Sequence, residues 1–542
     1  MPEVIVKYTG DISAAMSALS AQAEILGDSF AIITIESELI PELYNFREIE
    51  YIELPKNLSL SLRESMSESC ITQVHSMGAG RYGLSGKGVI VGIIDSGVDY
   101  THPDFIDNQG NSRILFMWDQ TSEGIPPGGF FSGVEYTAAQ FSQALKSPNP
   151  HSAIPATDTV GHGTAVAGIA AGNGRSSGGV ELGVAFEASL IVVRLGQRGR
   201  ESFARTTEIM RALKYVYDRA TELNMPIAVN LSFGTNNGSH TGNSLFEMYI
   251  DAISARWKSV IVAASGNEGF AGHHFRGIIE SGQTAEASLT VAGGLKSLYI
   301  TLWKNFADTL DFRIISPSGK TSPIASRDNP FVKMAVDGAD IAIYYGQPSF
   351  YNHNQEVYIS ISSQDDSIPD GIWRIIVTGR EVVDGEFEIW LPTIEEVGVD
   401  TAFTYPDPYN TLTLPSTAQK VITTGGYDAR IGSAADFSGR GTIFGKPDVV
   451  APAVEILTTR AGGGYDIFTG TSMAAPFVTG SAALMMEWGI VQRNDPFLYG
   501  QRIKAYLQKG ASRSPDITYP NPIWGYGALC LKRTMDYLQG GG

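Results

Sequence analysis

The sequence places a serine, a histidine and an aspartate in three separate glycine-containing segments. Ser472 precedes a long run of apolar and small residues, 473–488, which predicts a buried helix. A hydroxyl at a helix N-terminus lies beside unpaired backbone N–H groups and the positive end of the helix dipole. That position suits a nucleophile whose reaction creates an oxyanion, although the same pattern is also typical of a plain turn into a helix.

A serine hydroxyl becomes a nucleophile when an adjacent base takes its proton and a third group orients that base. Asp95 follows the apolar, β-branched run 88–94, so we expect it at the carboxyl edge of a sheet. His162 opens another predicted helix of small residues. Each residue alone is more often structural, but their chain order is that of the triad in subtilisin. Together they predict acyl transfer, with Ser472 attacking, His162 carrying the proton and Asp95 holding the imidazole.

Three segments resemble the active-site blocks of the subtilisin-like serine proteases, the subtilases. These segments are 95–97, 162–164 and 470–476. The resemblance extends over about residues 80–270 and 400–490. It implies a subtilisin-like α/β fold, a parallel sheet flanked by helices, and the activity of a serine endopeptidase.

The resemblance also implies which residues bind the substrate. Segment 263–269 resembles the family segment whose asparagine, here Asn267, donates to the oxyanion. Segment 230–234 resembles the strand that pairs with the substrate backbone and walls the P1 pocket. Glu268 would border that pocket and favour a polar or basic P1 side chain. The substrate-binding residues implied in this way are Leu231, Ser232, Phe233, Gly234, Gly266 and Glu268.

Length and charge restrict the classes of function. A chain of 542 residues is too long for one ordinary core, so we expect two or three domains. The net charge of −18 argues against nucleic acid or an anionic membrane as a partner. No apolar run is expected to reach the length that spans a bilayer. We therefore predict neither a nucleic-acid partner nor a membrane partner.

The N-terminus and the cysteines bear on the compartment. Residues 1–8 show no basic region followed by an apolar stretch, so no secretory signal is predicted. From Cys70 and Cys530, the two cysteines of the chain, we predict neither a disulfide framework nor a cysteine metal site. Both observations favour synthesis and retention inside the cell.

The sequence predicts no cofactor and no bound metal. Its eight histidines show no metal-ligand spacing. In many subtilases an aspartate at the position of Asp104 contributes to a calcium site. The partner loop, 172–179, carries an arginine and no carboxylate, whereas calcium needs several oxygen ligands. We therefore do not extend that calcium site to this chain.

Strands and helices alternate through the segments that carry the candidate residues, which predicts a parallel sheet covered on both faces. The Gly-, Pro- and Ser-rich stretch 124–155 is interpreted as an inserted surface loop. The predicted domains are an α+β domain (1–66), the first part of the catalytic domain (67–273), an inserted jelly-roll β-sandwich (274–393) and the second part of the catalytic domain (394–542).

The first domain resembles a subtilase propeptide, which assists folding and blocks the cleft until it is cut. Its pattern predicts strands at 4–8, 30–35 and 49–54 and a helix over 12–26. We predict that the chain cuts itself once between about Asn57 and His75, and that its own propeptide is a binding partner. The plain alternative is a decorative N-terminal domain.

The segment 274–393 has no convincing helix and several short strands at regular spacing, separated by turns with Gly and Pro. This pattern is typical of a sandwich, and it resembles the jelly-roll domains attached to several subtilases. The insert would either brace the core or form a platform for a substrate or partner.

An intact Asp-His-Ser set, a propeptide without a secretory signal and an inserted jelly roll together resemble the Csp-type germination proteases of spore-forming clostridia. That resemblance implies a spore-associated protease that activates a protein zymogen, such as a pro-hydrolase, by limited cleavage. Two alternatives stay open: a general intracellular subtilisin-like protease, and an inactive subtilase that binds or signals. Inactive relatives normally lack a triad residue, whereas Asp95, His162, Ser472 and Asn267 are all present.

Overall fold

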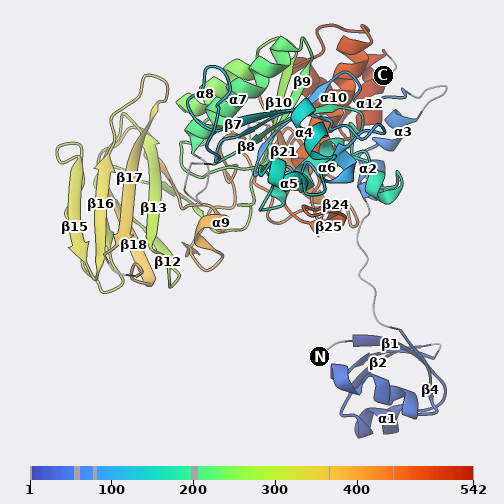
Figure 1. The fold of residues 1–542 in the computed structure, drawn as a ribbon. Coiled ribbons are helices and arrows are strands. Elements are labelled where there is room, and N and C mark those ends of the chain that lie inside the picture. The colour runs from blue at the N-terminus through green and yellow to red at the C-terminus, as the bar shows by residue number, and fades with distance from the viewer. Residues whose placement is uncertain are drawn as a thin grey trace. The chain divides into compact units, whose positions relative to one another are not determined.

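The computed structural model describes residues 3–27, 29–53, 62–76, 82–196, 205–364, 366–442 and 445–540. The chain separates into two compact units, Met1–Ser59 and Leu60–Gly542 (Figure 1). The second unit begins before the predicted domain boundary at residue 66.

The first unit is a four-stranded antiparallel sheet in the order β2-β3-β1-β4, packed on a short helix. Its elements are β1 (Glu3–Tyr8), α1 (Ser13–Ala18), β2 (Gln22–Gly27), β3 (Phe30–Thr34), the 3₁₀ helices η1 (Ser37–Leu39) and η2 (Pro41–Asn45), and β4 (Ile49–Glu53). The predicted helix over 12–26 is wrong in its second half. Ser20 adopts a left-handed backbone, with φ of 51°, which ends α1, and the residues that follow pair with β3 as an edge strand.

Two helices at the start of the second unit pack into its main core. They are α2 (Leu62–Glu68) and α3 (Thr72–His75). Leu62, Met66, Ile71 and Val74 are buried in the cluster that also contains the catalytic-core helices. These residues therefore belong structurally to the second unit.

The centre of the second unit is a nine-stranded sheet that is parallel except at its two ends. In spatial order its strands are β22 (Ser433–Ala434), β21 (Ile422–Asp428), β10 (Ser259–Ala264), β9 (Ile227–Leu231), β5 (Ile90–Asp95), β8 (Ser189–Arg194), β6 (Ile114–Asp119) and β7 (Val134–Thr137), while β23 (Val449–Pro452) also pairs with β21. β6 with β7 and β21 with β22 form the antiparallel pairs.

Helices cover both faces of this sheet, as the sequence predicts. α6 (His162–Ala171) and α10 (Thr471–Met486) lie on one face, and α7 (Thr206–Glu222) and α8 (Leu245–Ser254) lie on the other. Strand β5 supplies both cores in alternation: Val91 and Ile93 face α6 and α10, whereas Ile90 and Ile94 face α7 and α8. Because both faces are covered, a parallel strand of this kind is apolar along its whole length.

The stretch 124–155 is not a plain loop. It contains β7 and two helices, α4 (Ala138–Ala144) and α5 (Pro150–Ala153). β7 pairs with β6 and extends the central sheet. Thr137 and Gln140 then form a capping box that starts α4, so the interpretation of the whole stretch as a surface loop was wrong.

The inserted segment forms the predicted sandwich of two antiparallel sheets (Figure 1). The first sheet contains β11 (His274–Ile278), β19 (Glu386–Trp390), β13 (Ser297–Asn305), β17 (Asn354–Ser363), β16 (Ala339–Tyr345) and β15 (Phe331–Val336); the second contains β14 (Thr309–Ile315), β18 (Gly371–Glu381), β12 (Thr284–Val291) and β20 (Ala402–Phe403). Inward residues alternate along the strands, for example Val357, Ile359 and Ile361 of β17. The last strand, β20, lies beyond the predicted domain end at 393 and follows the short helix α9 (Ile394–Val397).

Trp390, at the end of β19, joins the sandwich to the α/β core. Its ring stacks between His240 at 4.1 Å and His274 at 4.8 Å, and its indole N–H donates to the carbonyl of Asn410. This buried contact between an insert residue and core residues favours the interpretation of the insert as a brace.

The remaining short elements complete the second unit. They are η3 (Pro103–Phe105), η4 (Arg175–Ser177), β24 (Ile456–Thr459), β25 (Tyr465–Phe468), the π turn η5 (Glu487–Val491), α11 (Gln501–Gly510) and α12 (Leu531–Leu538). The helical stretch Thr471–Val491 passes the length and composition test for a membrane span, so the prediction that no run is long enough was wrong. Because 83% of its tested window is buried inside the protein, this stretch is a core helix.

The two cysteines form a disulfide, Cys70–Cys530, with 4.8 Å between their Cα atoms. The prediction of no disulfide framework did not foresee this bond, which forms because α3 and α12 pack together. The N–H of Leu531 donates to the carbonyl of Ser69 at 3.0 Å, which aligns the two segments. Since disulfides persist mainly in oxidising compartments, the cysteines give no support to the prediction of an intracellular location.

Candidate active site

Asp95 and His162 form the first half of the candidate site. Asp95 is the last residue of β5, and His162 is the first residue of α6. The imidazole Nδ1 lies 2.7 Å from Asp95 Oδ1, and the Asp95 carboxylate is almost fully buried. The same Oδ1 accepts a hydrogen bond from the backbone N–H of Ser96. The pairing fixes the imidazole so that Nε2 is the nitrogen available for proton transfer.

The surroundings of His162 favour its charged form. Burial alone would lower the pKa of His162, but the charge and the hydrogen bond of Asp95 outweigh burial and raise it above its ordinary value of 6.5. The charges of Asp158 and Glu395 act in the same direction. A base with this environment can hold the proton that it takes from a nucleophile.

Asp158 is a buried residue that the sequence did not point to. Its Oδ1 accepts hydrogen bonds from Ser96 Oγ at 2.9 Å and from the N–H of Gly161 at 2.8 Å. Its Oδ2 accepts from the N–H and the hydroxyl of Thr164. Asp158 thus ties the end of β5 to the start of α6, the two places that carry Asp95 and His162.

Ser472 lies in the first turn of α10, next to the end of β9. Its hydroxyl donates to the carbonyl of Ser232 at 2.9 Å, and the hydroxyl of Ser232 donates to the carbonyl of Ser472 at 3.1 Å. Across the residues that the structure covers, the Ser472 hydroxyl makes no hydrogen bond to His162. The hydroxyl of the candidate nucleophile is therefore directed to the segment that follows β9, and not to the imidazole.

Asn267 follows β10 and is held beside Ser472. Its Oδ1 accepts hydrogen bonds of 3.1 Å from both the N–H and the hydroxyl of Thr471. This fixes the side-chain amide with its NH₂ group turned away from Thr471. That NH₂ group donates to Glu395 Oε1 at 3.1 Å, and Glu395 belongs to α9.

The predicted substrate-binding residues differ in exposure. Leu231 is buried in the sheet core and Phe233 packs half-buried against that core, while Gly234 is exposed. A Cβ at Gly234 would lie 2.1 Å from Thr413 Oγ1, and a Cβ at Gly266 would lie 2.5 Å from Thr413 Cγ2. Thr413 therefore fills the space between the two segments, and sequence reasoning gave no sign of this residue.

Glu268 lies in the interior, with 2% of its surface exposed. Its Oε2 lies 2.6 Å from His273 Nδ1 and accepts from Asn236 Nδ2, and its Oε1 accepts from the N–H of Ile394. Both carboxylate oxygens are thus engaged by the protein. The expected interaction with a P1 side chain has no support in this arrangement, which instead connects the segment that contains Asn267 to α9.

Asp104 also has its carboxylate engaged within the protein. Its Oδ1 accepts from the N–H of Ser176 and its Oδ2 from the hydroxyl of Tyr465, each at 2.8 Å. Within the described ranges, no group of three or more His, Cys, Asp or Glu side chains could hold a metal ion.

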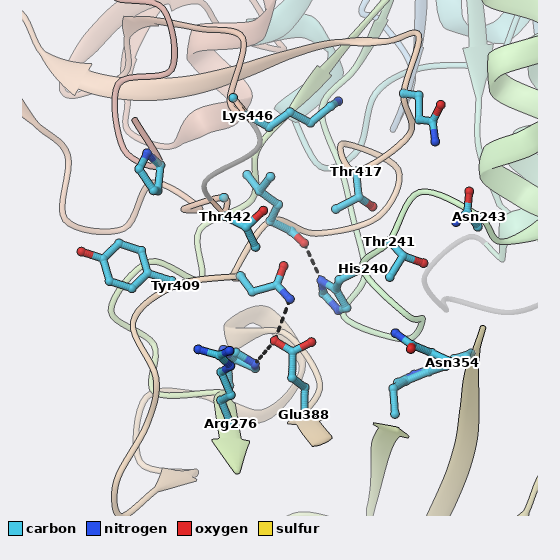
Figure 2. Close-up of a pocket in the computed structure, with 18 of the residues that line it drawn as sticks. His240, Thr241, Asn243, Arg276, Asn354, Glu388, Tyr409, Thr417, Thr442 and Lys446 are labelled. Carbon is cyan, nitrogen blue, oxygen red and sulfur yellow. Dashed lines mark hydrogen bonds and ion pairs between the residues drawn. The ribbon is translucent and has the colours of Figure 1, made fainter. Parts of the chain in front are cut away.

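A cavity of about 1270 Å³ lies between the sandwich and the core, away from these residues (Figure 2). Figure 2 shows His240 and Lys446 on the core side and Arg276 and Glu388 on the sandwich side. Burial lowers the pKa of His240 to about 4 and that of Lys446 to about 7. Asp95, His162, Asn267 and Ser472 do not line this cavity, so we do not place the chemistry there.

Comparison with known proteins decides the family. The model described as "Subtilase family" matches residues 86–363 and 406–527, which include Asp95, His162, Asn267 and Ser472. The chain belongs to the subtilase family of serine endopeptidases. The resemblance seen in the sequence, and the α/β fold that it implied, are thereby confirmed.

The relatives of this subtilase include a Csp protease. Residues 1–56 match the "Csp protease B prodomain" model, which confirms a propeptide-type N-terminal unit. The solved structure of the Clostridium perfringens CspB protease is 39% identical, with a TM-score of 0.81, and the match covers 88% of this subtilase and 98% of that chain.

The curated relatives are more distant. A PII-type proteinase of Lacticaseibacillus paracasei is 24% identical over 92% of this subtilase and 28% of that relative. A C5a peptidase of Streptococcus pyogenes is 23% identical over 76% of this subtilase and 36% of that relative. This subtilase thus spans about a third or less of the length of these curated relatives.

Proposed function

We propose that this subtilase hydrolyses peptide bonds by acyl transfer through Ser472, His162 and Asp95. The observation that carries the proposal is the 2.7 Å contact between His162 Nδ1 and the buried Asp95 carboxylate. It leaves Nε2 available for proton transfer, and α6, which begins at His162, packs against α10, which carries Ser472 in its first turn. Family membership supports the same assignment.

The reaction follows from these positions. Ser472 Oγ attacks the substrate carbonyl while its proton passes to His162 Nε2, and Asp95 stabilises the imidazolium without being protonated. The oxyanion would accept hydrogen bonds from Asn267 Nδ2 and the N–H of Ser472. His162 then returns the proton to the leaving amine, and water releases the acyl group by the same steps in reverse order.

We further propose that the natural reaction is limited cleavage of a protein zymogen, as a Csp-type protease would perform it. The prodomain match and the likeness to the CspB protease support the type. A physical reason also supports cleavage at only a few sites. Glu395, on the segment that leads out of the sandwich, contacts Asn267, so the insert borders the catalytic cleft and limits which segments of a protein substrate can enter it.

The breadth of cleavage tests this proposal. Incubation with casein and, separately, with a folded pro-hydrolase should give one or a few cuts in the pro-hydrolase and slow, incomplete cleavage of casein, as followed by mass spectrometry. Rapid conversion of casein into small peptides would instead favour the general protease.

The propeptide cut gives a separate prediction. We expect the cut on the N-terminal side of Leu62, which narrows the range of 57–75 predicted from the sequence. The reason is that α2 and α3 are packed into the core and cannot reach the cleft without unfolding. N-terminal sequencing of the active protein should find the new terminus before Leu62, and Ser472→Ala should remain uncut. An intact 542-residue species in an active preparation would contradict the prediction.

A further inference from the structure

The carboxylate of Glu395 lies at the donor group on which the proposed chemistry depends. Asn267 Nδ2 donates to Glu395 Oε1 at 3.1 Å, while the other end of the Asn267 amide is held by Thr471. The oxyanion of the reaction must lie at a similar distance from the same Nδ2. A fixed negative charge is therefore next to the position where a second negative charge develops.

The structure holds Glu395 at this position through its neighbours. The N–H of Ile394, directly before it, donates to Glu268 Oε1 at 2.9 Å, and Glu268 directly follows Asn267. Glu268 is in turn fixed by Asn236, whose amide also donates to the carbonyl of Leu391. A buried carboxylate with three partners thus anchors the start of α9 to the oxyanion segment.

Through the ranges for which contacts are known, no Lys or Arg forms an ion pair with Glu395. Its effect on His162, where it favours the imidazolium, is weaker than that of Asp95. Its contact with Asn267 is direct, and Coulomb energies grow as the distance shrinks. We therefore expect the repulsion between Glu395 and the oxyanion to exceed the attraction between Glu395 and the imidazolium.

We propose that Glu395 is an electrostatic brake, by which the insert lowers the rate of acyl transfer at Ser472. The brake rests on the proposed function, because it acts on the oxyanion of that reaction. It acts while the carboxylate is bound to Asn267 and is relieved when the side chain moves away or loses its charge. Since Glu395 is solvent-exposed, neither change requires the core to open.

The test is the rate of labelling by a fluorophosphonate probe, together with kcat/KM for a short peptide ester, on the full chain. Glu395→Gln keeps the shape and an acceptor oxygen but removes the charge, and we expect both rates to rise about 5- to 30-fold. Glu395→Ala should show a similar rise. The matched control is Asp400→Asn, which removes one exposed charge from the same segment and should change the rates less than about twofold.

Two further measurements separate a brake from a structural effect. The increase in rate caused by Glu395→Gln should be smaller at about 1 M salt. The Debye length there is about 3 Å, so the salt screens the carboxylate of the unchanged chain from the oxyanion. The increase should also fall below about twofold in the Asn267→Ala background, because the contact that holds the carboxylate is gone. A gain that survives both changes would overturn the brake.

Unchanged or slower labelling of both Glu395 variants would also overturn the proposed brake. Slower labelling would mean that Glu395 is a positioning residue for Asn267. The same series includes Ser472→Ala, which tests the proposed function by itself. If Ser472→Ala still labels, the proposed function is wrong, whatever the Glu395 variants show.

Discussion

Ser472→Ala is expected to lose all labelling by a fluorophosphonate probe and to hydrolyse peptides about 10⁶-fold more slowly, the size of the loss known for the triad serine of subtilisin. The reason is that the acyl intermediate forms on the Ser472 oxygen, which alanine lacks. The hydroxyl of Ser232 also lies at the site, but it donates to the carbonyl of Ser472. Labelling stoichiometry by intact mass, and the initial rate with a peptide ester, measure the effect.

Ser433→Ala, at an exposed serine of β22, is the matched control and should label like the unchanged chain. Equal thermal unfolding of both variants would show that the lost reactivity is chemical. Full labelling of Ser472→Ala would place the nucleophile elsewhere. A correctly folded chain that never labels would favour the inactive, binding subtilase.

Asp95→Asn is expected to lower kcat about 10⁴-fold, because the amide stabilises the wrong imidazole tautomer and cannot balance the imidazolium charge. Asp95 is also the strongest of the groups that raise the pKa of His162 against the lowering effect of burial. The base must be neutral to accept a proton. In the unchanged chain, kcat/KM should therefore rise with pH through a midpoint above 6.5.

In Asp95→Asn the midpoint of the pH profile should move to lower pH. Burial lowers the pKa of His162, and the variant lacks the Asp95 charge that opposes this effect. Residual activity measured from about pH 5 to 9 provides the profile, within the range where histidine titrates. An acidic limb at the same pH in both proteins would mean that His162 is not the titrating base.

The central sheet and the places of Asp95, His162 and Ser472 were predictable because each depends on local pattern. A parallel strand buried on both faces, such as β5, appears as an unbroken apolar run with the functional residue at its end. The helix that follows Ser472 shows itself by its small, apolar residues. Local pattern was misleading in the first unit, where the pairing of β2 with β3 outweighed the helical preference of an alanine-containing segment.

The residues that modify the site could not be predicted, because their partners are distant in the chain. Glu395 contacts Asn267 across 128 positions, and it reaches the cleft through the exit of the insert. Thr413 lies against Gly234 and Gly266 because the chain re-enters the core after the insert. Glu268 was expected at the edge of the P1 pocket because segment 263–269 resembles the family segment, yet its side chain lies in a buried network.

The disulfide makes most of the catalytic unit a covalent ring, since Cys70 and Cys530 are 460 positions apart. A single nick in an exposed turn between them would open the ring without releasing a fragment, and the two pieces would stay joined until the bond is reduced. The predicted propeptide cut lies outside the ring, before Cys70. The disulfide thus separates an N-terminal part that one cut can release from the segment between Cys70 and Cys530, which one cut leaves covalently joined.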